Sequence, residues 1–256
     1  NADPYWMASL TMPQLNTDLD GSYSARSMFV PTLDVVETYY TKNGVPIDED
    51  PEFAYDNRYE VRQATSNEKW QIREGEYTAR LHFDREPRFY ASIGFPGRLW
   101  TMNSASSDAS YINQQFWYSH DDSKAGLAGA GSNVNDYNIS GYTPVKYIHP
   151  DDSWAGGKGN VKGSFITSPK PFAIIRYAEV LLEYVEALNN VTGTVTVTTP
   201  DMTGTDVEVT VSRDVQEMAK YFNMIRYRVG LPGPSLSDMN DASRFEQIIR
   251  NERQVE

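Results

Sequence analysis

The feature that most constrains this chain is a helical repeat of apolar residues at positions 171–190. Hydrophobic residues recur there at intervals of three and four, at Ile174, Ala178, Leu181, Val185 and Leu188. This spacing predicts a helix that presses one face onto a core. Ser168 can cap the beginning of this helix, and Pro171 suits its first turn. Asn189 and Asn190 can end it.

The same stretch carries charged residues in one narrow stripe, again three and four residues apart, at Arg176, Glu179, Glu183 and Glu186. The rest of the stretch is nearly apolar, so we expect the helix to be buried on most sides. An unpaired buried carboxylate costs several kcal/mol, so the stripe needs partners. We expect arginines of neighbouring helices to meet it, with the candidates Arg226, Arg228, Arg250 and Arg253.

Three other segments show a helical period. Residues 32–40 predict a short helix with the apolar face Leu33, Val36 and Tyr40. Residues 212–228 predict a longer one, antiparallel to the central helix, with the face Val215, Met218, Phe222, Ile225 and Val229. A last helix is expected from near Asp241 to the end, presenting Phe245, Ile248, Glu252 and Val255. The fold class is therefore mainly α.

Two segments show strand patterns. In residues 192–211, valines alternate with Thr and Glu on both sides of a Pro-Asp-Met-Thr-Gly turn, which predicts a β-hairpin inserted between two helices. We expect its valines to lie outside the helical core. In residues 84–93, Phe89, Ala91 and Ile93 alternate with polar or amphipathic neighbours, and Pro87 disfavours helix at the residue before it. We interpret that segment as a turn entering a strand.

Composition excludes several kinds of partner and site. The chain has 35 acidic and 23 basic residues, a formal charge of −12, which argues against nucleic acid as a partner. It has no cysteine, so a disulfide framework and a thiolate metal site are impossible. Asn16, Asp18 and Asp20 match the first half of a calcium loop. Ser27 stands where the bidentate Glu belongs, which favours an Asx-rich turn over a calcium site.

No catalytic constellation is visible in the sequence. His82, His120 and His149 stand apart, without the spacing of a zinc hydrolase, and no hydrolase nucleophile motif is present. Adjacent acidic pairs such as Asp121 and Asp122 are typical of solvated turns. We therefore expect no enzyme activity and no cofactor.

Residues 98–170 form a long segment rich in Gly, Ser, Asn and Asp, with scattered aromatic residues and little regular periodicity. Such segments often carry function. We predict ligand contacts here. Trp100, Trp117 and Trp154 are the predicted rings on which a ligand stacks, and Tyr111 and Tyr118 are secondary ones. Asn113 and Gln114 are the predicted hydrogen-bond partners of ligand hydroxyl groups. The alternatives are that Trp100 seals the core and that Asn113 and Gln114 cap a short helix.

Six segments in order resemble the SusD/RagB family of surface nutrient-binding lipoproteins. They are PTLDVVETYY (31–40) with KNGVPI (42–47), DREPRFY (84–90), GYTPVKY (141–147), IRYAEVLL (175–182) with EALN (186–189), NMIRYRVGLP (223–232) and IIRNERQVE (248–256). The resemblance implies a SusD-like, tetratricopeptide-like helical scaffold with long irregular loops. The hairpin at residues 192–211 departs from the family, which usually joins these helices through a short turn.

The resemblance also implies a role. Family members capture an oligosaccharide at the outer-membrane surface and hand it to a SusC-like TonB-dependent transporter. They are longer than this chain and carry a lipid-bearing Cys in an amino-terminal half that is absent here. We therefore expect residues 1–256 to be the carboxy-terminal region of such a protein, a single domain and incomplete as a folding unit. Lipid attachment would lie outside the chain.

Three alternatives stay open at this point. The chain could be a glycan-degrading enzyme or its accessory domain, a peptide-binding member of the same family, or a structural helical-repeat adaptor. Release of reducing sugar would support the enzyme, whereas ligand-dependent quenching of Trp fluorescence without turnover would support the binding protein. If neither response is observed, the structural adaptor remains as the explanation.

Overall fold

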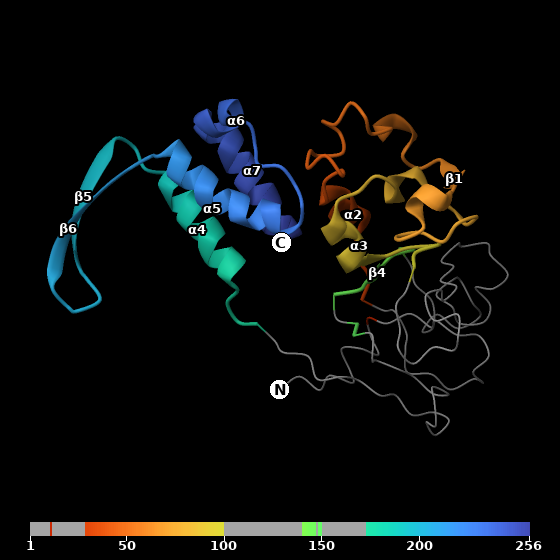
Figure 1. The fold of residues 1–256 in the computed structure, drawn as a ribbon, viewed down its shortest axis with the longest axis horizontal. Coiled ribbons are helices and arrows are strands. Elements are labelled where there is room, and N and C mark those ends of the chain that lie inside the picture. The colour runs from red at the N-terminus through yellow and green to blue at the C-terminus, as the bar shows by residue number, and fades with distance from the viewer. Residues whose placement is uncertain (1–10, 12–28, 100–139, 147, 150–172) are drawn as a thin grey trace, which may run out of the picture. The chain divides into compact units, whose positions relative to one another are not determined.

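A computed structural model describes residues 11, 29–99, 140–146, 148–149 and 173–256 (Figure 1). The chain divides into two compact units. The first unit comprises Asn1–Thr41 and Val45–Pro171, and the second unit comprises Lys42–Gly44 and Phe172–Glu256. The expectation of a single domain stays a prediction, because two compact units can still fold together. The described elements are mainly helices, joined by small antiparallel sheets of two strands each.

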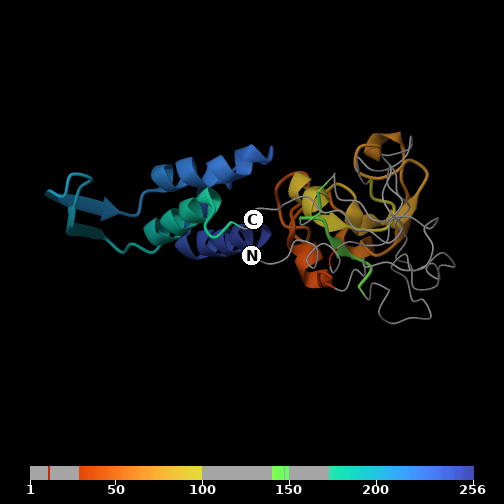
Figure 2. The same ribbon diagram turned by 90° about the horizontal axis from the view of Figure 1, so that it is seen from below.

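The second unit is built from three helices that lie side by side in both views (Figures 1 and 2). They are α4 (Tyr177–Asn189), α5 (Val215–Arg228) and α7 (Ala242–Val255), with the short α6 (Leu236–Asn240) before α7. Asp214 and Asp241 cap α5 and α7 by accepting hydrogen bonds from backbone N–H groups of the first turn. The predicted antiparallel pairing of α4 and α5 is confirmed.

An apolar core holds these helices together, and most of the predicted face residues take part in it. Its buried members are Leu181, Leu182, Val185, Leu188, Met218, Phe222, Ile225, Met239, Phe245 and Ile249. The Phe222 and Phe245 rings meet edge to face with centroids 5.4 Å apart. On α7, Ile249 is buried and the predicted Ile248 packs only partly against the core.

The predicted start of the central helix is wrong. α4 begins at Tyr177, and Arg176 is its N-cap without a side-chain capping bond. Ile174, predicted on the apolar face, precedes the helix and is 87% exposed. The predicted capping residues at 168 and 171 lie outside the described residues. The helix is also not buried on most sides, because Val180 and Tyr184 face solvent and neighbouring helices cover one face only.

The charged stripe of α4 finds fewer partners than expected. Of the four candidate arginines, Arg253 contacts Glu186. The other three pair with acidic residues of α7 or the chain end: Arg226 with Glu252, Arg228 with Glu256, and Arg250 with Glu246. Arg176 itself donates to Glu256 across 3.0 Å. An exposed stripe needs no compensation, so the arginines instead pair with carboxylates close to them, including the fully buried Glu252.

The predicted hairpin is present. β5 (Thr194–Pro200) and β6 (Asp206–Ser212) pair antiparallel, from Thr194 opposite Ser212 to Pro200 opposite Asp206. Figure 1 shows the pair extending beyond the ends of α4 and α5. Gly204, at φ 83°, allows the tight turn, and Asp201 Oδ1 accepts from the N–H groups of Thr203 and Thr205. All residues of both strands are exposed except Val211, which packs partly against the helical core. The predicted position outside the core is therefore confirmed for the exposed valines, including Val195 and Val209, and is wrong for Val211.

The first unit consists of short elements. In chain order they are α2 (Leu33–Thr38), η1 (Tyr55–Asn57), β1 (Val61–Gln63), η2 (Ser66–Glu68), β2 (Tyr77–Ala79), η3 (Arg80–His82), α3 (Pro87–Ser92), β3 (Ile93–Gly94) and β4 (Thr143–Pro144). β1 pairs with β2, and β3 pairs with β4, both antiparallel. Val36 and Tyr40 of the predicted first apolar face are buried, whereas Leu33 is 40% exposed.

The predicted strand in residues 84–93 is mostly a helix. α3 begins at Pro87, and only Ile93 and Gly94 are in a strand. Proline lacks an N–H and has a fixed φ, which suits the first helical position, so Pro87 begins a helix and does not open a strand. Arg88 and Phe89 are both buried on this helix, an adjacency that an alternating strand would not allow.

A buried arginine organises the first unit. Arg85 is 3% exposed, and its guanidinium donates to the carbonyl oxygens of Val36, Tyr39, Tyr40 and Leu81. Three of these carbonyls belong to α2 or its C-terminal end, which a helix leaves without internal partners. Burial lowers the pKa of Arg85 to about 10, so the side chain stays charged at neutral pH. One cation thus joins α2 to the segment that leads into α3.

Candidate functional site

The small β1–β2 sheet has one face inside the first unit and one face toward solvent. Thr78 is fully buried, and the Arg62 guanidinium lies 3.5 Å from the centre of the Phe83 ring, so these residues mark the inner face. Val61, Gln63 and Tyr77 alternate with them and mark the outer face. Tyr77 is 57% exposed and lies directly opposite Gln63. An aromatic ring and an amide group therefore stand side by side on the surface.

Buried hydrogen bonds support this sheet from below. Thr78 Oγ1 lies 2.6 Å from His82 Nδ1, and His82 Nε2 lies 3.0 Å from the Tyr142 hydroxyl. The His82 ring also stacks on Phe95, with centroids 4.4 Å apart. Burial lowers the pKa of His82 to about 3, so the ring is neutral at ordinary pH. The arrangement is structural: it holds β2 in place, and with it the face of the sheet on which Tyr77 lies.

A second exposed ring, Tyr59, lies two residues before β1. The Arg58 guanidinium is stacked between two tyrosines, 3.9 Å from the Tyr55 ring centre and 4.3 Å from that of Tyr59. Glu37 Oε1 of α2 accepts hydrogen bonds from Arg58 Nε at 2.8 Å and from the Tyr59 hydroxyl at 2.6 Å. The ring of Tyr59 is thus held in one orientation while 53% of the residue stays exposed.

Trp70 is the most exposed described aromatic residue of the first unit, at 79%. It follows η2, where Thr65 and Glu68 form a capping box and Glu68 also pairs with Arg62 at 2.8 Å. Immediately after it, Gln71 O accepts from Leu99 N, and Ile72 pairs with Arg98. Trp70 therefore lies beside the point where the chain enters residues 100–139. A large apolar ring exposed this far is typical of a binding surface.

Val61, Gln63 and Tyr77 belong to the β1–β2 sheet, Tyr59 precedes β1, and Trp70 lies on the connection between the two strands. We name these five exposed residues the aromatic surface. Its rings offer flat apolar faces. The Gln63 amide nitrogen donates to the Gly75 carbonyl oxygen at 2.9 Å, which leaves its second N–H and its oxygen for a ligand. Such a set can bind a ligand that has both apolar and hydroxylated faces. Within the described ranges, no group of His, Asp and Glu is arranged to hold a metal ion.

All seven sequence-predicted ligand residues lie outside the described residues: Trp100, Tyr111, Asn113, Gln114, Trp117, Tyr118 and Trp154. The candidate calcium ligands Asn16, Asp18 and Asp20 lie outside them as well. These assignments therefore stay predictions. The sequence analysis missed the aromatic surface, because exposure of Trp70 and Tyr77 depends on which side of a three-residue strand faces the core. The only available sign was a Trp among polar neighbours in a segment without an apolar period.

Among the described residues, no helix has the length and the apolar character that are needed to cross a membrane. A search of curated proteins found no match. Solved structures do match. A SusD-like protein (BF3747) from Bacteroides fragilis NCTC 9343 is 22% identical with a TM-score of 0.58, over 100% of this chain and 38% of its own.

BT4246 matches in two structures. One is 21% identical with a TM-score of 0.62, over 100% of this chain and 36% of that protein, and its selenomethionine form is 22% identical with a TM-score of 0.57, over 90% and 33%. The chain thus spans between a third and two fifths of the length of these proteins, and at this identity the likeness shows the fold. The family model of the SusD family matches residues 1–256, and the chain belongs to that family.

Proposed function

We propose that this chain is part of a protein that binds an oligosaccharide at its surface and does not cleave it. The observation that carries the proposal is the aromatic surface: three exposed rings on a rigid support in a chain of the SusD family. Nutrient capture by glycan binding is the general role of that family.

A sugar fits the chemistry of this surface better than other ligand classes do. A pyranose ring has an apolar C–H face that stacks on Trp or Tyr, and hydroxyl groups that pair with an amide such as Gln63. Fixed rings lose little conformational entropy when a ligand binds, and the hydrogen bond to Glu37 supplies that fixation for Tyr59. The chain's formal charge of −12 disfavours polyanionic ligands.

The proposal extends to delivery and place. A SusC-like TonB-dependent transporter is the proposed recipient of the captured oligosaccharide, and the outer-membrane surface is the proposed location. Attachment would come from a lipid anchor outside this chain. Family membership supports these steps.

Titration calorimetry against a panel of glycans tests the site. Trp70→Ala and Tyr77→Ala should each weaken binding about tenfold or more, since an aromatic contact at the centre of a site contributes roughly 1–3 kcal/mol. The melting temperature should barely move, because both rings are exposed. Tyr177→Ala is the matched control: this ring is 67% exposed on α4, in the second unit, and its removal should leave affinity unchanged.

Unchanged affinity in both Trp70→Ala and Tyr77→Ala, with the protein folded, would contradict the aromatic surface. Trp100→Ala, Trp117→Ala and Trp154→Ala would then test the site predicted from the sequence. Binding of peptides and not of glycans by the same variants would favour the peptide-binding alternative.

A further inference from the structure

The β5–β6 hairpin is an unusual structure for a folded protein. A hairpin of two strands has little stability of its own in water and normally packs against a third strand or a helix. Here all seven residues of β5 are exposed, and within the described residues no third strand pairs with the sheet. One face carries the valines at 195, 197, 207, 209 and 211, most of them 37–47% exposed. Val211 packs partly against the helical core, whereas the outer edge of β5 and the other four valines are exposed to a partner.

The two edges differ in charge. β6 carries Asp206 and Glu208, and acidic side chains on an edge strand discourage pairing with another chain. β5 reads Thr-Val-Thr-Val-Thr-Thr-Pro and has no charge at all. Alternate residues of an edge strand direct N–H and C=O groups outward, so β5 presents an unguarded row of donors and acceptors. Pro200 interrupts that row only at its far end.

The β5 sequence is complementary to itself. Residues 194–198 read Thr-Val-Thr-Val-Thr in either direction. If two copies pair antiparallel about Thr196, valine lies opposite valine and threonine opposite threonine. Opposed residues of an antiparallel pair share a face, so the two valine faces join into one. A register shifted by one residue would instead join a valine face to a threonine face, which is unfavourable.

We propose that β5 is a docking edge for a second copy of this chain, giving a four-stranded sheet in the order β6, β5, β5, β6. The acidic residues then lie on the two outer strands, about 14 Å apart, three strand spacings of about 4.8 Å each. That separation exceeds the screening length of about 8 Å at physiological ionic strength. Pairing through β6 would bring the same acidic residues onto adjacent strands. The assembly therefore closes as a two-fold dimer and does not grow into a filament.

This inference does not depend on the proposed function, and cysteine cross-linking tests it directly. The chain has no cysteine, so one introduced residue can react only with its copy or an added reagent. Thr196→Cys places the new side chains opposite each other on the two-fold axis, at a Cβ separation of about 4.5–5.5 Å, which a small approach of the two strands brings to the roughly 3.5–4.5 Å of a disulfide. Mild oxidation should give a covalent dimer in high yield. Thr210→Cys, the cross-strand neighbour on β6, should not.

Sedimentation of uncross-linked protein gives a second readout. The unmodified chain should show a concentration-dependent dimer. Thr196→Lys should weaken it about tenfold or more, because like charges directly opposite each other destabilise a strand pair. Thr210→Lys, on the same face of the same hairpin, should leave it unchanged. An unmodified chain that is monomeric up to its highest soluble concentration would overturn the proposal, as would equal cross-linking of Thr196→Cys and Thr210→Cys.

Discussion

The two units of this chain are held together in different ways. In the second unit, three helices bury an apolar layer at helical spacing. In the first unit, short elements pack around buried aromatic residues such as Phe89 and Phe95, and a buried arginine that donates to four carbonyl groups, together with the Thr78–His82–Tyr142 hydrogen bonds, links them. Short elements leave many backbone groups unpaired, and polar side chains must satisfy them. The difference teaches that a unit built from short elements needs buried polar side chains in addition to its apolar core.

The largest expected effect comes from removing the central cation of the first unit. Arg85→Met should lower the free energy of unfolding of that unit by about 3–5 kcal/mol, because the buried carbonyls of Val36, Tyr39 and Leu81 lose their donor. All five Trp residues belong to the first unit. Urea unfolding followed by Trp fluorescence therefore reports this loss.

Phe222→Ala is the counterpart in the second unit. Phe222 is fully buried against Phe245, so its truncation should cost about 3–5 kcal/mol. The loss should be seen first in helical circular dichroism, since α4, α5 and α7 supply most of the described helix. Equal shifts of both signals in both variants would show that the two units unfold as one.

The two units should also differ in how their stability depends on pH. Burial lowers the pKa of His82 from 6.5 to about 3. Between these two pH values, His82 is protonated in the unfolded chain and neutral in the folded first unit. Stability from this group is complete above pH ~6.5 and is lost as pH falls toward ~3, at about 1.4 kcal/mol per pH unit. Between pH 7 and pH 5 the first unit should lose about 2 kcal/mol.

His82→Gln provides the comparison for that measurement, since it keeps hydrogen-bonding groups beside Thr78 and Tyr142 but cannot titrate. Its Trp-monitored stability should change less between the same two pH values. The second unit contains no histidine, so its helical signal should not show this dependence. An identical pH dependence in the variant would mean that His82 is not the responsible group.

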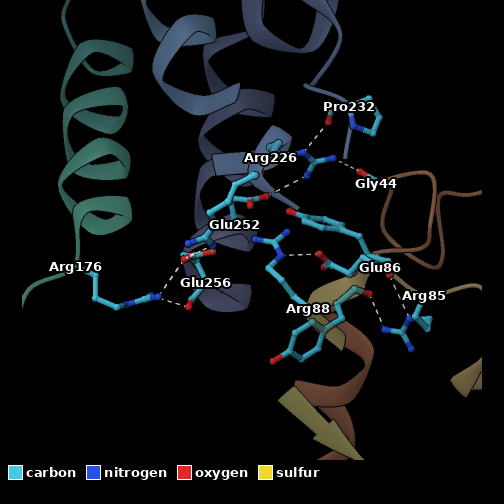
Figure 3. A network of polar contacts seen from close by, with 12 residues as sticks. Gly44, Arg85, Glu86, Arg88, Arg176, Arg226, Pro232, Glu252 and Glu256 are labelled. Atoms are coloured by element: carbon cyan, nitrogen blue, oxygen red, sulfur yellow. Dashed lines mark hydrogen bonds and ion pairs between the residues drawn. The ribbon is translucent and has the colours of Figure 1, made fainter. Parts of the chain in front are cut away.

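A smaller effect is expected where the chain turns at Gly44. This residue has φ 74°, and a Cβ there would lie 2.6 Å from Arg226 Nη2. Arg226 also binds the carbonyl oxygens of Gly44 and Pro232 and the carboxylate of Glu252 (Figure 3). Gly44→Ala should cost about 1–2 kcal/mol through backbone strain and displacement of the guanidinium. Chemical denaturation followed by circular dichroism measures it, and no change would show that the segment is adaptable.

The smallest effect is expected in the hairpin. Val209→Asp should change the free energy of unfolding by less than about 0.5 kcal/mol, because Val209 is 39% exposed and lies outside both cores. Val185→Asp, at a fully buried position of α4, is the contrasting variant and should prevent stable folding of the second unit. A large loss of cooperativity in Val209→Asp would place the hairpin in a core.

The sequence predicted some elements of the fold and missed others. Helical period located α4, α5 and α7, since their contacts repeat every three to four residues, and valine alternation located the hairpin. The start of α4 was missed because an apolar Ile174 continues the period without packing on anything. α3 was missed because alternation over a few residues also fits one turn and a half of helix. The hydrogen bonds from Arg85 to carbonyl groups 45–49 residues away in the sequence leave no local sequence pattern by which to predict them.

The sequence and the structure give different candidate sites. The ligand contacts that the sequence predicts in residues 100–154 stay a prediction, whereas the aromatic surface is defined by the exposure of Trp70 and Tyr77 in and beside a sheet of three-residue strands. Whether a tyrosine faces water or the core is decided by a register set by Thr78 and His82. That register depends on tertiary contacts, so it cannot be predicted from the amino-acid composition.

The central claim is glycan binding without cleavage, and one titration tests it most directly. A panel of oligosaccharides is added to the protein while Trp fluorescence and the amount of reducing ends are followed in the same sample. The account predicts saturable quenching by at least one glycan, with reducing ends unchanged over hours. Reducing ends that increase with time and protein concentration would contradict it and indicate an enzyme, and an unchanged fluorescence across the panel would indicate a structural adaptor.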